Sequence, residues 1–591
     1  MNSHKGTDLR RGTSFVRDLS HESDRYLNAK PNFPSNEPKL RIIPLGGSQE
    51  IGGRNLTVIE YGKDILVVDM GLMFPEEDQP GVDFIIPNPT YLKGKEDNIR
   101  GVLITHGHMD HIGGIPQVMQ MIGNPPIYAT ALTMALIQKK QTDNPMAPPL
   151  NAHVVELDKV YKFGIFDVEF WHINHSIPDS TCLVIRTPEG VVLHTGDYKI
   201  DHSPLGEPAA DMGRFARLGN EGVAVFLADS TGAQKPGHAI SETTIQHNID
   251  AIFKQAKGKV IAATFSSLLN RIQQIIKISE FYGRKVVIEG YSMRTNIQII
   301  RDLGYADFNP RTIISPHEAT KLPPSQLTII STGAQGEPNA ALMRIANNEH
   351  KFFQIEKGDT VIFSSSVIPG NEASVGRLKD IIAKRKAQII HYKMMDVHVG
   401  GHAPAEDLRM MIKLIRPKYI QPIYGDFYSL KLHGDIAMEC GMTRDQVLLT
   451  DNGRVVEVHN GEARVTTEKV PAHTMMVDGL GVGDLGEGII RDRQLLAQDG
   501  MLTVIAIIDS KKGDLYQSPE IVSKGFVYMK SSFKLIDAIA GEVKKTVKKK
   551  VTKGEGINDE YIKQAIKDDL AKFIFEKTQR RPMIIPVVIE V

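Results

Sequence analysis

The chain has 591 residues and a mass of 65.5 kDa, a length that indicates about three or four domains. Apolar residues make up 41% and charged residues 24%, as in soluble globular proteins, and no stretch approaches the roughly 18 apolar residues of a membrane helix. The N-terminal segment lacks the apolar core of a secretory signal. The two cysteines, Cys182 and Cys440, exclude a disulfide scaffold and a cysteine-rich zinc fold, so we expect a protein of the reducing cytoplasm.

The formal net charge is zero, but the charges are unevenly distributed. Residues 240–395 hold 20 Lys and Arg against 13 Asp and Glu, and residues 488–591 hold 19 against 14. The part of the chain outside these two blocks is therefore acidic. Acidic and basic blocks in one chain predict a cation-binding part and a polyanion-binding part, although an uneven scatter of surface charge would look the same.

In chain order, a polar segment (1–38) predicts a flexible tail. Short strands separated by glycine and charged turns, with occasional helices, predict an α/β sandwich with mixed sheets over 39–239. Over 240–395 apolar strands alternate with helical segments, which is typical of a parallel, doubly wound sheet. Residues 396–470 return to the first pattern, so we expect the second domain to be inserted into the first.

The C-terminal part begins after a segment rich in Gly and Asp, 471–494, which we interpret as a linker. Residues 495–591 predict a small α/β domain. Apolar residues at helical spacing between Ile536 and Val551 form one stripe of a helix, and five lysines between Lys544 and Lys550 crowd the rest of it. A solvated face explains these lysines better than an RNA site does.

The strongest chemical signal is THGHMDHIGG, residues 105–114, which follows the apolar strand GVLI. His106 and His108 are two residues apart and point the same way in extended backbone, so they can share one ion. Asp110 and His111, where the chain turns, can reach a second ion. Imidazole and carboxylate ligands together favour Zn²⁺ or Mn²⁺ over Ca²⁺.

Two later segments follow strands and can complete this site. WHINHSIPDS offers His172 and His175, and VVLHTGDYK offers His194 and Asp197. A carboxylate at Asp197 can bridge two cations roughly 3.5–4 Å apart, an arrangement found in phosphate-ester hydrolases. His172 and His194 have no evident chemical role and are interpreted as ordinary strand-end residues.

The HGHMDH motif resembles that of the metallo-β-lactamase superfamily, and the inserted βα domain resembles that of its β-CASP branch. The similarity extends to bacterial ribonuclease J from about residue 39 to the end of the chain. It implies an αββα sandwich with an inserted β-CASP domain and a small C-terminal α/β domain. The segments that carry it include VVDMGLMFPEEDQPGVDFIIP, THGHMDHIGG, NHSIPDS, HTGDYK, ADSTGAQKPG, STGAQGEPNAAL, SSSVIPGNE, HVGGHAPAEDL, DGLGVGDLGEGIIRDR and RRPMIIPVVIEV.

The resemblance implies a ribonuclease that acts on single-stranded RNA in rRNA processing and mRNA decay. Its modes would be a 5′-to-3′ exonuclease that prefers 5′-monophosphate ends and an endonuclease. It implies two zinc ions per chain, with Mn²⁺ as the alternative, a homodimer or homotetramer, and other RNA-decay proteins as partners. The implied ligands are His106, His108, His175 and Asp197 for the first zinc, and Asp110, His111 and Asp197 for the second.

Further site residues follow from the same resemblance. Asp69 matches the supporting acid of the first strand motif, Asp229 matches the acid that opens the β-CASP region, and His402 matches a histidine beside the scissile phosphate. With Asp110 these are the expected catalytic residues. The residues expected to bind RNA and its 5′ phosphate are Ser266, Ser267, Arg271, His398, Gly400 and His402.

Three positions depart from the family pattern. Leu268 stands where the family has Asn, and Gly400 where it has Ser, so each change removes a polar group from the phosphate pocket. Tyr424 stands in the turn PIYGDF, where the family has its last metal ligand, a histidine, and it can bind the second metal only as a phenolate. These departures leave an alternative open, a weakly active or non-catalytic RNA-binding subunit that partners an active paralogue. A small-molecule hydrolase is disfavoured, because a small substrate needs no basic insertion of this size.

Overall fold

The computed structural model describes residues 33, 37–76, 78–368, 370–483, 486–509, 511–527, 532–551 and 558–591. Most of the predicted N-terminal tail (1–38) lies outside these residues. The chain divides into two compact units, one of residues 1–73 and 86–474 and the other of residues 74–85 and 475–591.

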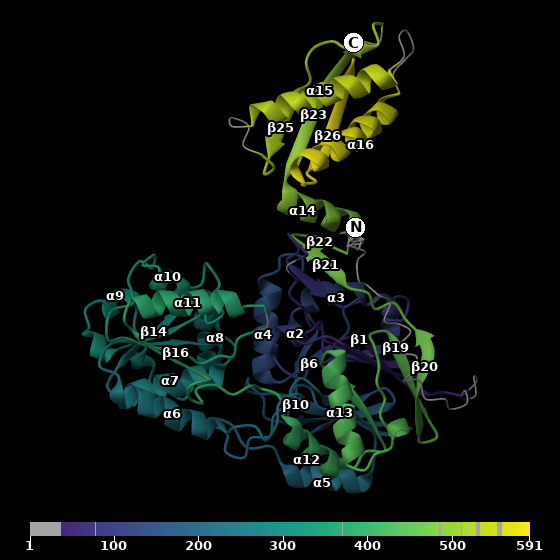
Figure 1. The fold of residues 1–591 in the computed structure, drawn as a ribbon. Coiled ribbons are helices and arrows are strands. Elements are labelled where there is room, and N and C mark those ends of the chain that lie inside the picture. The colour runs from purple at the N-terminus through teal and green to yellow at the C-terminus, as the bar shows by residue number, and fades with distance from the viewer. Residues whose placement is uncertain are drawn as a thin grey trace, which may run out of the picture. The chain divides into compact units, whose positions relative to one another are not determined.

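Two sheets form one part of the first unit, beside the domain of α6–α11, residues 242–384 (Figure 1). The larger sheet has the strand order β20-β19-β1-β2-β3-β5-β6-β7 in the described residues. Its strands are β1 (Leu40–Gly46), β2 (Leu56–Tyr61), β3 (Asp64–Val68), β5 (Ile99–Leu103), β6 (Ile127–Ala129), β7 (Ala152–Val154), β19 (Arg454–His459) and β20 (Glu462–Lys469). The smaller sheet has the order β18-β12-β11-β10-β9-β8, with β8 (Val160–Phe163), β9 (Phe166–His172), β10 (Thr181–Thr187), β11 (Gly190–His194), β12 (Val223–Asp229) and β18 (Tyr419–Ile423).

The sheets face each other across a common apolar core. In β9 apolar and acidic residues alternate, so Phe166, Val168 and Phe170 all point into this core. There they meet Leu40 of β1 and Leu66 of β3 from the other sheet. The alternation that indicated strands in the sequence therefore also determines which face of each sheet is buried.

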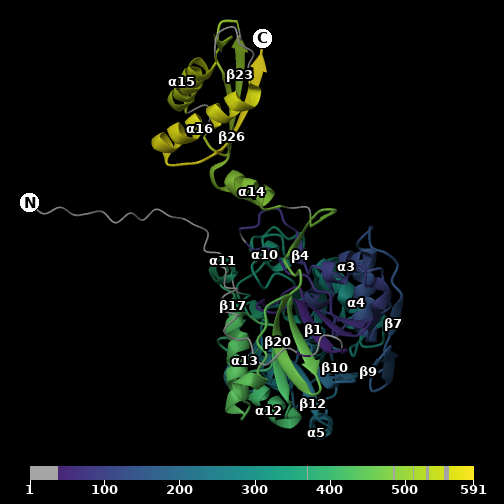
Figure 2. The same ribbon diagram turned by 90° about the vertical axis from the view of Figure 1, so that its right-hand side faces the viewer.

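Helices cover the two outer faces, with α12 and α13 on one side of the sheets and α3 and α4 on the other (Figure 2). Leu408, Met411, Ile412 and Ile415 of α12 recur every three or four residues and pack on the smaller sheet. The helices on this side are α5 (Met212–Glu221), α12 (Ala405–Ile415) and α13 (Phe427–Glu439), and those on the other are α2 (Met109–Ile112), α3 (Ile115–Met121) and α4 (Ala131–Thr142). The expected αββα sandwich is thus confirmed.

The inserted domain is a parallel sheet of order β14-β15-β13-β16-β17 with helices on both faces. Helices α6–α8 pack on one face and α9–α11 on the other (Figure 1). β12 and β18 flank the insertion in sequence yet pair directly, with Asp229 opposite Ile423. The elements are α6 (Glu242–Gln255), β13 (Val260–Ala263), α7 (Leu269–Phe281), β14 (Lys285–Glu289), α8 (Tyr291–Asp302), α9 (Pro316–Ala319), β15 (Leu327–Ser331), α10 (Ala341–Ala346), β16 (Thr360–Phe363), α11 (Glu372–Lys384) and β17 (Gln388–His391).

The second unit is built around β23, which pairs antiparallel with β24 and β25 and parallel with β26. Alternate residues of β23 are buried under α15 and α16, and the lysines of α15 from Lys544 to Lys549 are exposed. The segment interpreted as a linker contains β21, β22 and the start of α14. The elements are β4 (Phe84–Ile86), β21 (Met475–Asp478), β22 (Gly481–Val482), α14 (Glu487–Asp499), β23 (Met501–Asp509), β24 (Asp514–Leu515), β25 (Glu520–Lys524), α15 (Phe533–Lys550), α16 (Asp559–Thr578) and β26 (Met583–Glu590). None of the helices in the described part of the chain has the length and apolar character that a membrane crossing requires.

Candidate metal centre and active site

The candidate site lies where five strands of the sandwich end. Asp69 follows β3, His106 follows β5, His175 follows β9 and Asp197 follows β11, while Asp229 is the last residue of β12. Beyond the end of a strand, side chains no longer have to alternate between the two faces of the sheet, while the adjacent buried strand still holds the backbone in place. The structure therefore brings together residues that are up to 160 positions apart in the sequence.

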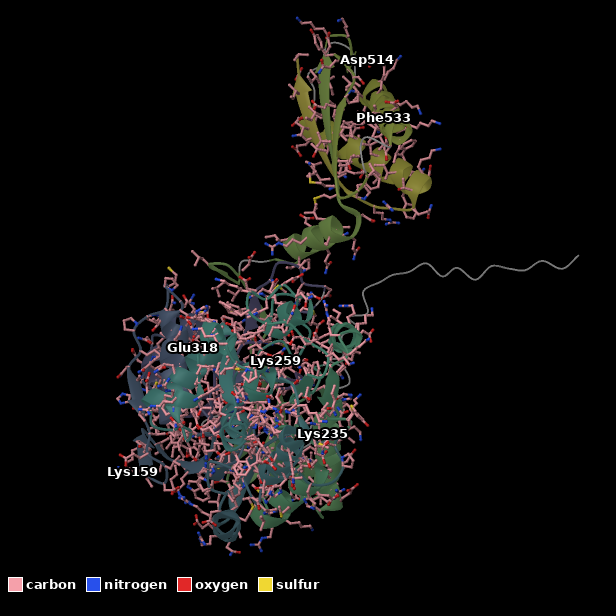
Figure 3. All side chains as sticks on the ribbon, turned by 90° about the vertical axis from the view of Figure 1, so that its left-hand side faces the viewer. Lys159, Lys235, Lys259, Glu318, Asp514 and Phe533 are labelled. Atoms are coloured by element: carbon pink, nitrogen blue, oxygen red, sulfur yellow. The ribbon has the colours of Figure 1, made fainter. Side chains whose placement is uncertain are left out.

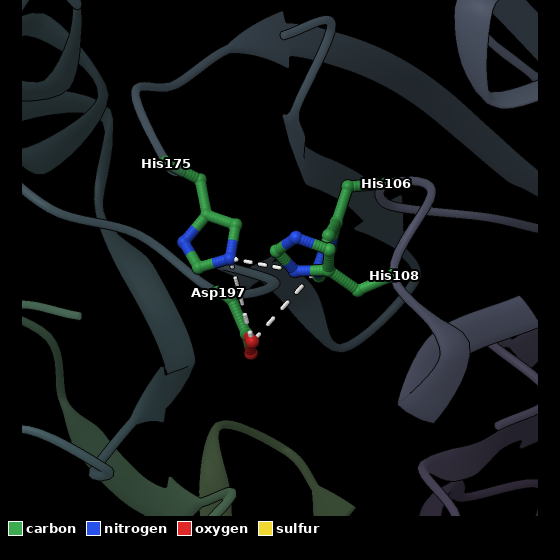
Figure 4. A group of neighbouring side chains, drawn as sticks. All are labelled: His106, His108, His175 and Asp197. Atoms are coloured by element: carbon green, nitrogen blue, oxygen red, sulfur yellow. Dashed lines mark hydrogen bonds and ion pairs between the residues drawn. The ribbon is translucent and has the colours of Figure 1, made fainter. Parts of the chain in front are cut away.

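The first cluster consists of His106, His108, His175 and Asp197, whose ligand atoms lie within 4.8 Å of one another (Figure 4). The Nδ1 atom of His108 is 3.1 Å from Nε2 of His106 and 3.0 Å from Nε2 of His175. Oδ2 of Asp197 is 3.8 Å from both of those Nε2 atoms. Three ring nitrogens and a carboxylate that converge in this way form a donor set for a divalent cation.

Burial keeps the three imidazoles of this cluster unprotonated. Desolvation, followed by the neighbouring imidazoles, holds the pKa of His106 and His175 well below the usual value, and desolvation lowers the pKa of His108 to about 4. The three rings are therefore neutral and have lone pairs for a metal. Oδ1 of Asp197 is buried without a hydrogen-bond partner among the described residues. The residues present fit a bound cation.

The loop before α12 sets the orientation of the His175 ring. Nδ1 of His175 donates a hydrogen bond to the carbonyl oxygen of Gly401 at 2.6 Å, so Nε2 carries the lone pair that faces the cluster. A Cβ atom at position 401 would lie 2.3 Å from Cε1 of His175, so only glycine fits there. The HVGGH segment thus contributes to the candidate metal site through its backbone.

The second cluster consists of Asp110, His111 and Asp197. Nε2 of His111 is 3.3 Å from Oδ2 of Asp197 and 3.6 Å from Oδ2 of Asp110. Nδ1 of His111 donates to Oδ2 of Asp69 at 2.7 Å, which directs Nε2 toward the cluster. Burial opposes a positive charge on His111, but Asp197 and Asp69 outweigh it and raise its pKa well above the usual value. This ring therefore attracts a cation, which can be a proton or a metal ion, and Asp197 is common to both clusters.

His402 stands beside Asp197, the residue common to both clusters, and is oriented by Asp229. Its Nδ1 atom is 2.8 Å from Oδ2 of Asp229 and 3.9 Å from Oδ2 of Asp197. Burial alone would lower its pKa, but the charges of Asp229 and Asp197 raise it to about 9. His402 is therefore protonated at neutral pH and can donate a proton from Nε2.

Tyr424 lies within a chain of hydrogen bonds. Its Oη atom is 3.2 Å from Nε2 of His194 and 3.3 Å from Oδ2 of Asp69. The backbone N–H of Gly196 donates to Nδ1 of His194, so Nε2 of His194 bears the proton and donates to Oη, and the phenol donates to Asp69. Burial and the Asp69 charge raise the pKa of Tyr424 well above 10, so the phenol keeps its proton.

The expected phosphate pocket is assembled around the start of α7. Ser266 and Ser267 are partly exposed in the turn before that helix. Nδ1 of His398 is buried without a partner among the described residues, and burial, followed by the charge of Arg271, lowers the pKa of His398 to about 3. The imidazole is therefore neutral. Leu268 is buried and contributes no side-chain hydrogen bond to the helix start.

Arg271 is 3% exposed, and its guanidinium is engaged inside the protein. It donates to Oε2 of Glu242 at 2.5 Å, and to Oγ of Ser364 and the carbonyl oxygen of Val397, both at 2.7 Å. Val397 precedes His398, so the structure gives Arg271 a role in holding the loop that carries the pocket.

Four residues near the site were not among the predicted site residues. Thr105 donates its hydroxyl and backbone N–H to Asp69, and His194 supports Tyr424. Asn55 places Nδ2 at 2.9 Å from Nε2 of His111. Lys235, labelled in Figure 3, is exposed, and its Nζ atom lies 3.1 Å from the position of a Cβ at residue 400. Thr105, His194 and Lys235 lay in the motifs THGHMDHIGG, HTGDYK and ADSTGAQKPG that the sequence had singled out, whereas Asn55 lay in none of them.

Comparison with protein families agrees with this geometry. The metallo-beta-lactamase superfamily matches residues 50–212, the ribonuclease J beta-CASP domain matches 257–382, and the ribonuclease J C-terminal domain matches 488–591. Ribonuclease J2 of Bacillus subtilis is 39% identical over 556 residues, which cover 94% of this chain and 99% of that protein. The chain belongs to the ribonuclease J family.

Other relatives agree with this assignment. Ribonuclease J 1 of Streptococcus pyogenes is 37% identical over 95% of this chain and 99% of its own length. Among solved structures, a protein of unknown function from Enterococcus faecalis V583 superposes with a TM-score of 0.50 at 16% identity, over 71% of this chain and all of that one. That likeness supports the fold alone. In this ribonuclease J family member, the HGHMDH motif and the strand-end residues form one His/Asp centre suited to divalent metal ions.

Proposed function

We propose that the chain is a metal-dependent ribonuclease that hydrolyses phosphodiester bonds of single-stranded RNA. Its modes would be 5′-to-3′ exonuclease from 5′-monophosphate ends and endonuclease. The observation that carries the proposal is the pair of donor clusters that share Asp197, beside the protonated His402. Family membership and the names of the relatives support RNA as the substrate.

The two clusters are the proposed binding sites for two divalent ions, zinc with manganese as the alternative. The first would use His106, His108, His175 and Asp197, and the second Asp110, His111 and Asp197. When bound, such ions activate water at neutral pH and neutralise charge on a phosphate. The second site has fewer histidines and lacks the expected one at position 424, so we expect it to hold its ion more weakly than the first.

The protein groups would then act on the leaving group. His402 is 24% exposed, with Nδ1 fixed by Asp229, so its Nε2–H is left to protonate the departing 3′ oxygen of the RNA. Asp229 stabilises the positive ring before the proton leaves. Asp69 would be a positioning residue, because it orients His111 through a hydrogen bond to Nδ1 and does not face the substrate.

The 5′ end of the RNA would bind around Ser266, Ser267, His398 and Gly400. Hydroxyls, the neutral imidazole and backbone N–H groups suit a phosphate, and Lys235 adds a cation beside Gly400. In this proposal Arg271 positions the pocket through Val397. The basic inserted domain would hold the RNA backbone through its excess of Lys and Arg.

Cytoplasmic location and assembly as a homodimer or homotetramer belong to the same proposal. The free thiols Cys182 and Cys440 are compatible with a reducing compartment.

The test is cleavage of a 5′-monophosphorylated single-stranded RNA by the full-length protein with added Mn²⁺ or Zn²⁺. Asp197→Ala removes the residue that both clusters share and is expected to abolish cleavage. His172→Ala is the matched control, because Nε2 of His172 contacts the Pro208 carbonyl oxygen and lies outside both clusters. RNA binding without cleavage at every metal concentration would identify the chain as a non-catalytic subunit instead.

A further inference from the structure

Asn55 is fixed beside the second cluster by its backbone. Its N–H donates to the carbonyl oxygen of Asp110 at 3.1 Å, and its own carbonyl oxygen accepts from the N–H of Gly71 at 2.9 Å. The residue is 2% exposed. The same peptide segment that presents Asp110 to the site therefore also holds Asn55 in place, so the position of its side chain is determined by the fold.

The side-chain amide of Asn55 meets the ligand atom of His111. Nδ2 lies 2.9 Å from Nε2 of His111, the nitrogen that faces the second cluster. The amide oxygen, Oδ1, is buried and has no hydrogen-bond partner among the described residues. A buried acceptor without a partner lowers the stability of the fold by about 1–3 kcal/mol. In this orientation the NH₂ group of Asn55 has a partner and its oxygen has none among the described residues.

A rotation of the amide by 180° exchanges Oδ1 and Nδ2 and changes little in volume. It places the oxygen at about the present separation from Nε2 of His111, where the two atoms need a shared cation between them, either the proton of His111 or a metal ion that replaces it. The separation of 2.9 Å between the amide and Nε2 of His111 suits a hydrogen bond in the present orientation, and it is also short enough for both groups to bind one ion after the rotation.

The surroundings leave Asn55 as the available ligand on this side. The phenol of Tyr424 already donates to Asp69 and accepts from His194, so its oxygen is engaged away from His111. A Cβ at position 47 would lie 2.3 Å from Oδ1 of Asn55, so the glycine there makes room for the amide.

We propose that the side-chain oxygen of Asn55 is a ligand of the second metal ion, in place of the histidine that the chain lacks at position 424. This inference rests on the proposed two-metal function. The resulting donor set of Asp110, His111, Asp197 and Asn55 is mostly oxygen and favours an octahedral ion such as Mn²⁺, whereas the three histidines of the first cluster favour zinc.

The test is a calorimetric titration of the metal-free, full-length protein with Mn²⁺, which counts the bound ions and gives a Kd for each without measuring cleavage. Asn55→Ala is expected to leave the first Kd unchanged and to raise the second by about tenfold or more. Asn55→Asp supplies a charged oxygen at the same place and is expected to lower the second Kd. The Asp variant also tests the inference if the Ala variant folds poorly.

Asn88 provides the matched control, because it is 1% exposed and its Nδ2 contacts the imidazole of His473 in the same unit. Asn88→Ala and Asn88→Asp are expected to leave both Kd values unchanged. An unchanged or lower second Kd in Asn55→Ala overturns the inference, since the amide would then be a bystander or an obstacle. That result, obtained while the wild type binds two ions, overturns the inference alone, whereas a wild-type chain that binds only one ion or none overturns the proposed two-metal function as well.

Discussion

The hydroxyl of Tyr424 can be removed without removing the ring by Tyr424→Phe. The structure gives this oxygen two hydrogen bonds, from Nε2 of His194 and to Oδ2 of Asp69. Asp69 keeps the N–H and hydroxyl of Thr105 as donors, but the N–H of His194 is left buried without an acceptor. That loss is expected to destabilise the first unit by about 1–3 kcal/mol.

The effect on the second metal ion is expected to be small. Tyr424 contacts Asp69, and Asp69 contacts and orients the proposed ligand His111, so the phenol acts on the ligand only through Asp69. Loss of a residue that contacts a metal ligand directly costs about 10–100-fold in metal affinity. Tyr424→Phe is therefore expected to raise the second Kd by less than tenfold, whereas Asp69→Asn is expected to raise it by at least that factor.

Thermal unfolding and Mn²⁺ titration of the three proteins separate these effects. Each kcal/mol corresponds to a fall of about 2–4 °C in Tm for a domain of 150–250 residues. A second Kd that rises more in Tyr424→Phe than in Asp69→Asn, with Tm unchanged, would show that the phenol oxygen is itself a ligand and would refute this reasoning. Tyr424→His is expected to lower the second Kd, because it supplies an imidazole, and to reduce the need for added metal.

Four further outcomes are expected. RNA affinity should fall steeply as salt rises, because phosphate contacts release counterions, and a flat plot of log Kd against log salt would exclude a polyanion site. Lys235→Gln should reduce the preference of the exonuclease for 5′-monophosphate over 5′-triphosphate RNA, and equal wild-type rates on both ends would show that no phosphate pocket exists. Removal of residues 488–591 should yield a monomer by light scattering, and an unchanged oligomer would place the interface elsewhere. Burial, opposed by the charge of Lys199, raises the pKa of Glu207 to about 8 in the folded protein. As the pH rises from about 4.5, the unfolded chain loses this proton before the folded protein does. The free energy of unfolding should therefore fall by at most about 1.4 kcal/mol for each unit of pH increase up to about pH 8. Glu207→Gln should flatten the dependence of Tm on pH over that window, and parallel curves would contradict it.

Local patterns in the sequence predicted which elements form and which side chains gather at the candidate site. The spacing of His106, His108, Asp110 and His111 after an apolar strand predicts metal ligands, because strand geometry fixes where neighbouring side chains point. The alternation of strands and helices over 240–395 predicts a doubly wound insertion. The parallel strands β13–β17 with helices on both faces agree with a doubly wound sheet, and the pairing of β12 with β18 agrees with an insertion.

Roles that depend on distant partners were decided only by the tertiary structure. The same residue types fit several roles in the sequence: Arg271 was a candidate phosphate ligand, and its engagement with Glu242 and Val397 depends on how α7 packs against the loop before Gly400. His194 was interpreted as an ordinary strand-end residue, yet folding brings its Nε2 atom within hydrogen-bond distance of the hydroxyl of Tyr424, 230 positions away. A hydrogen bond requires donor and acceptor within about 3 Å, and a local pattern of residues carries no information on which distant groups the packed core brings that close.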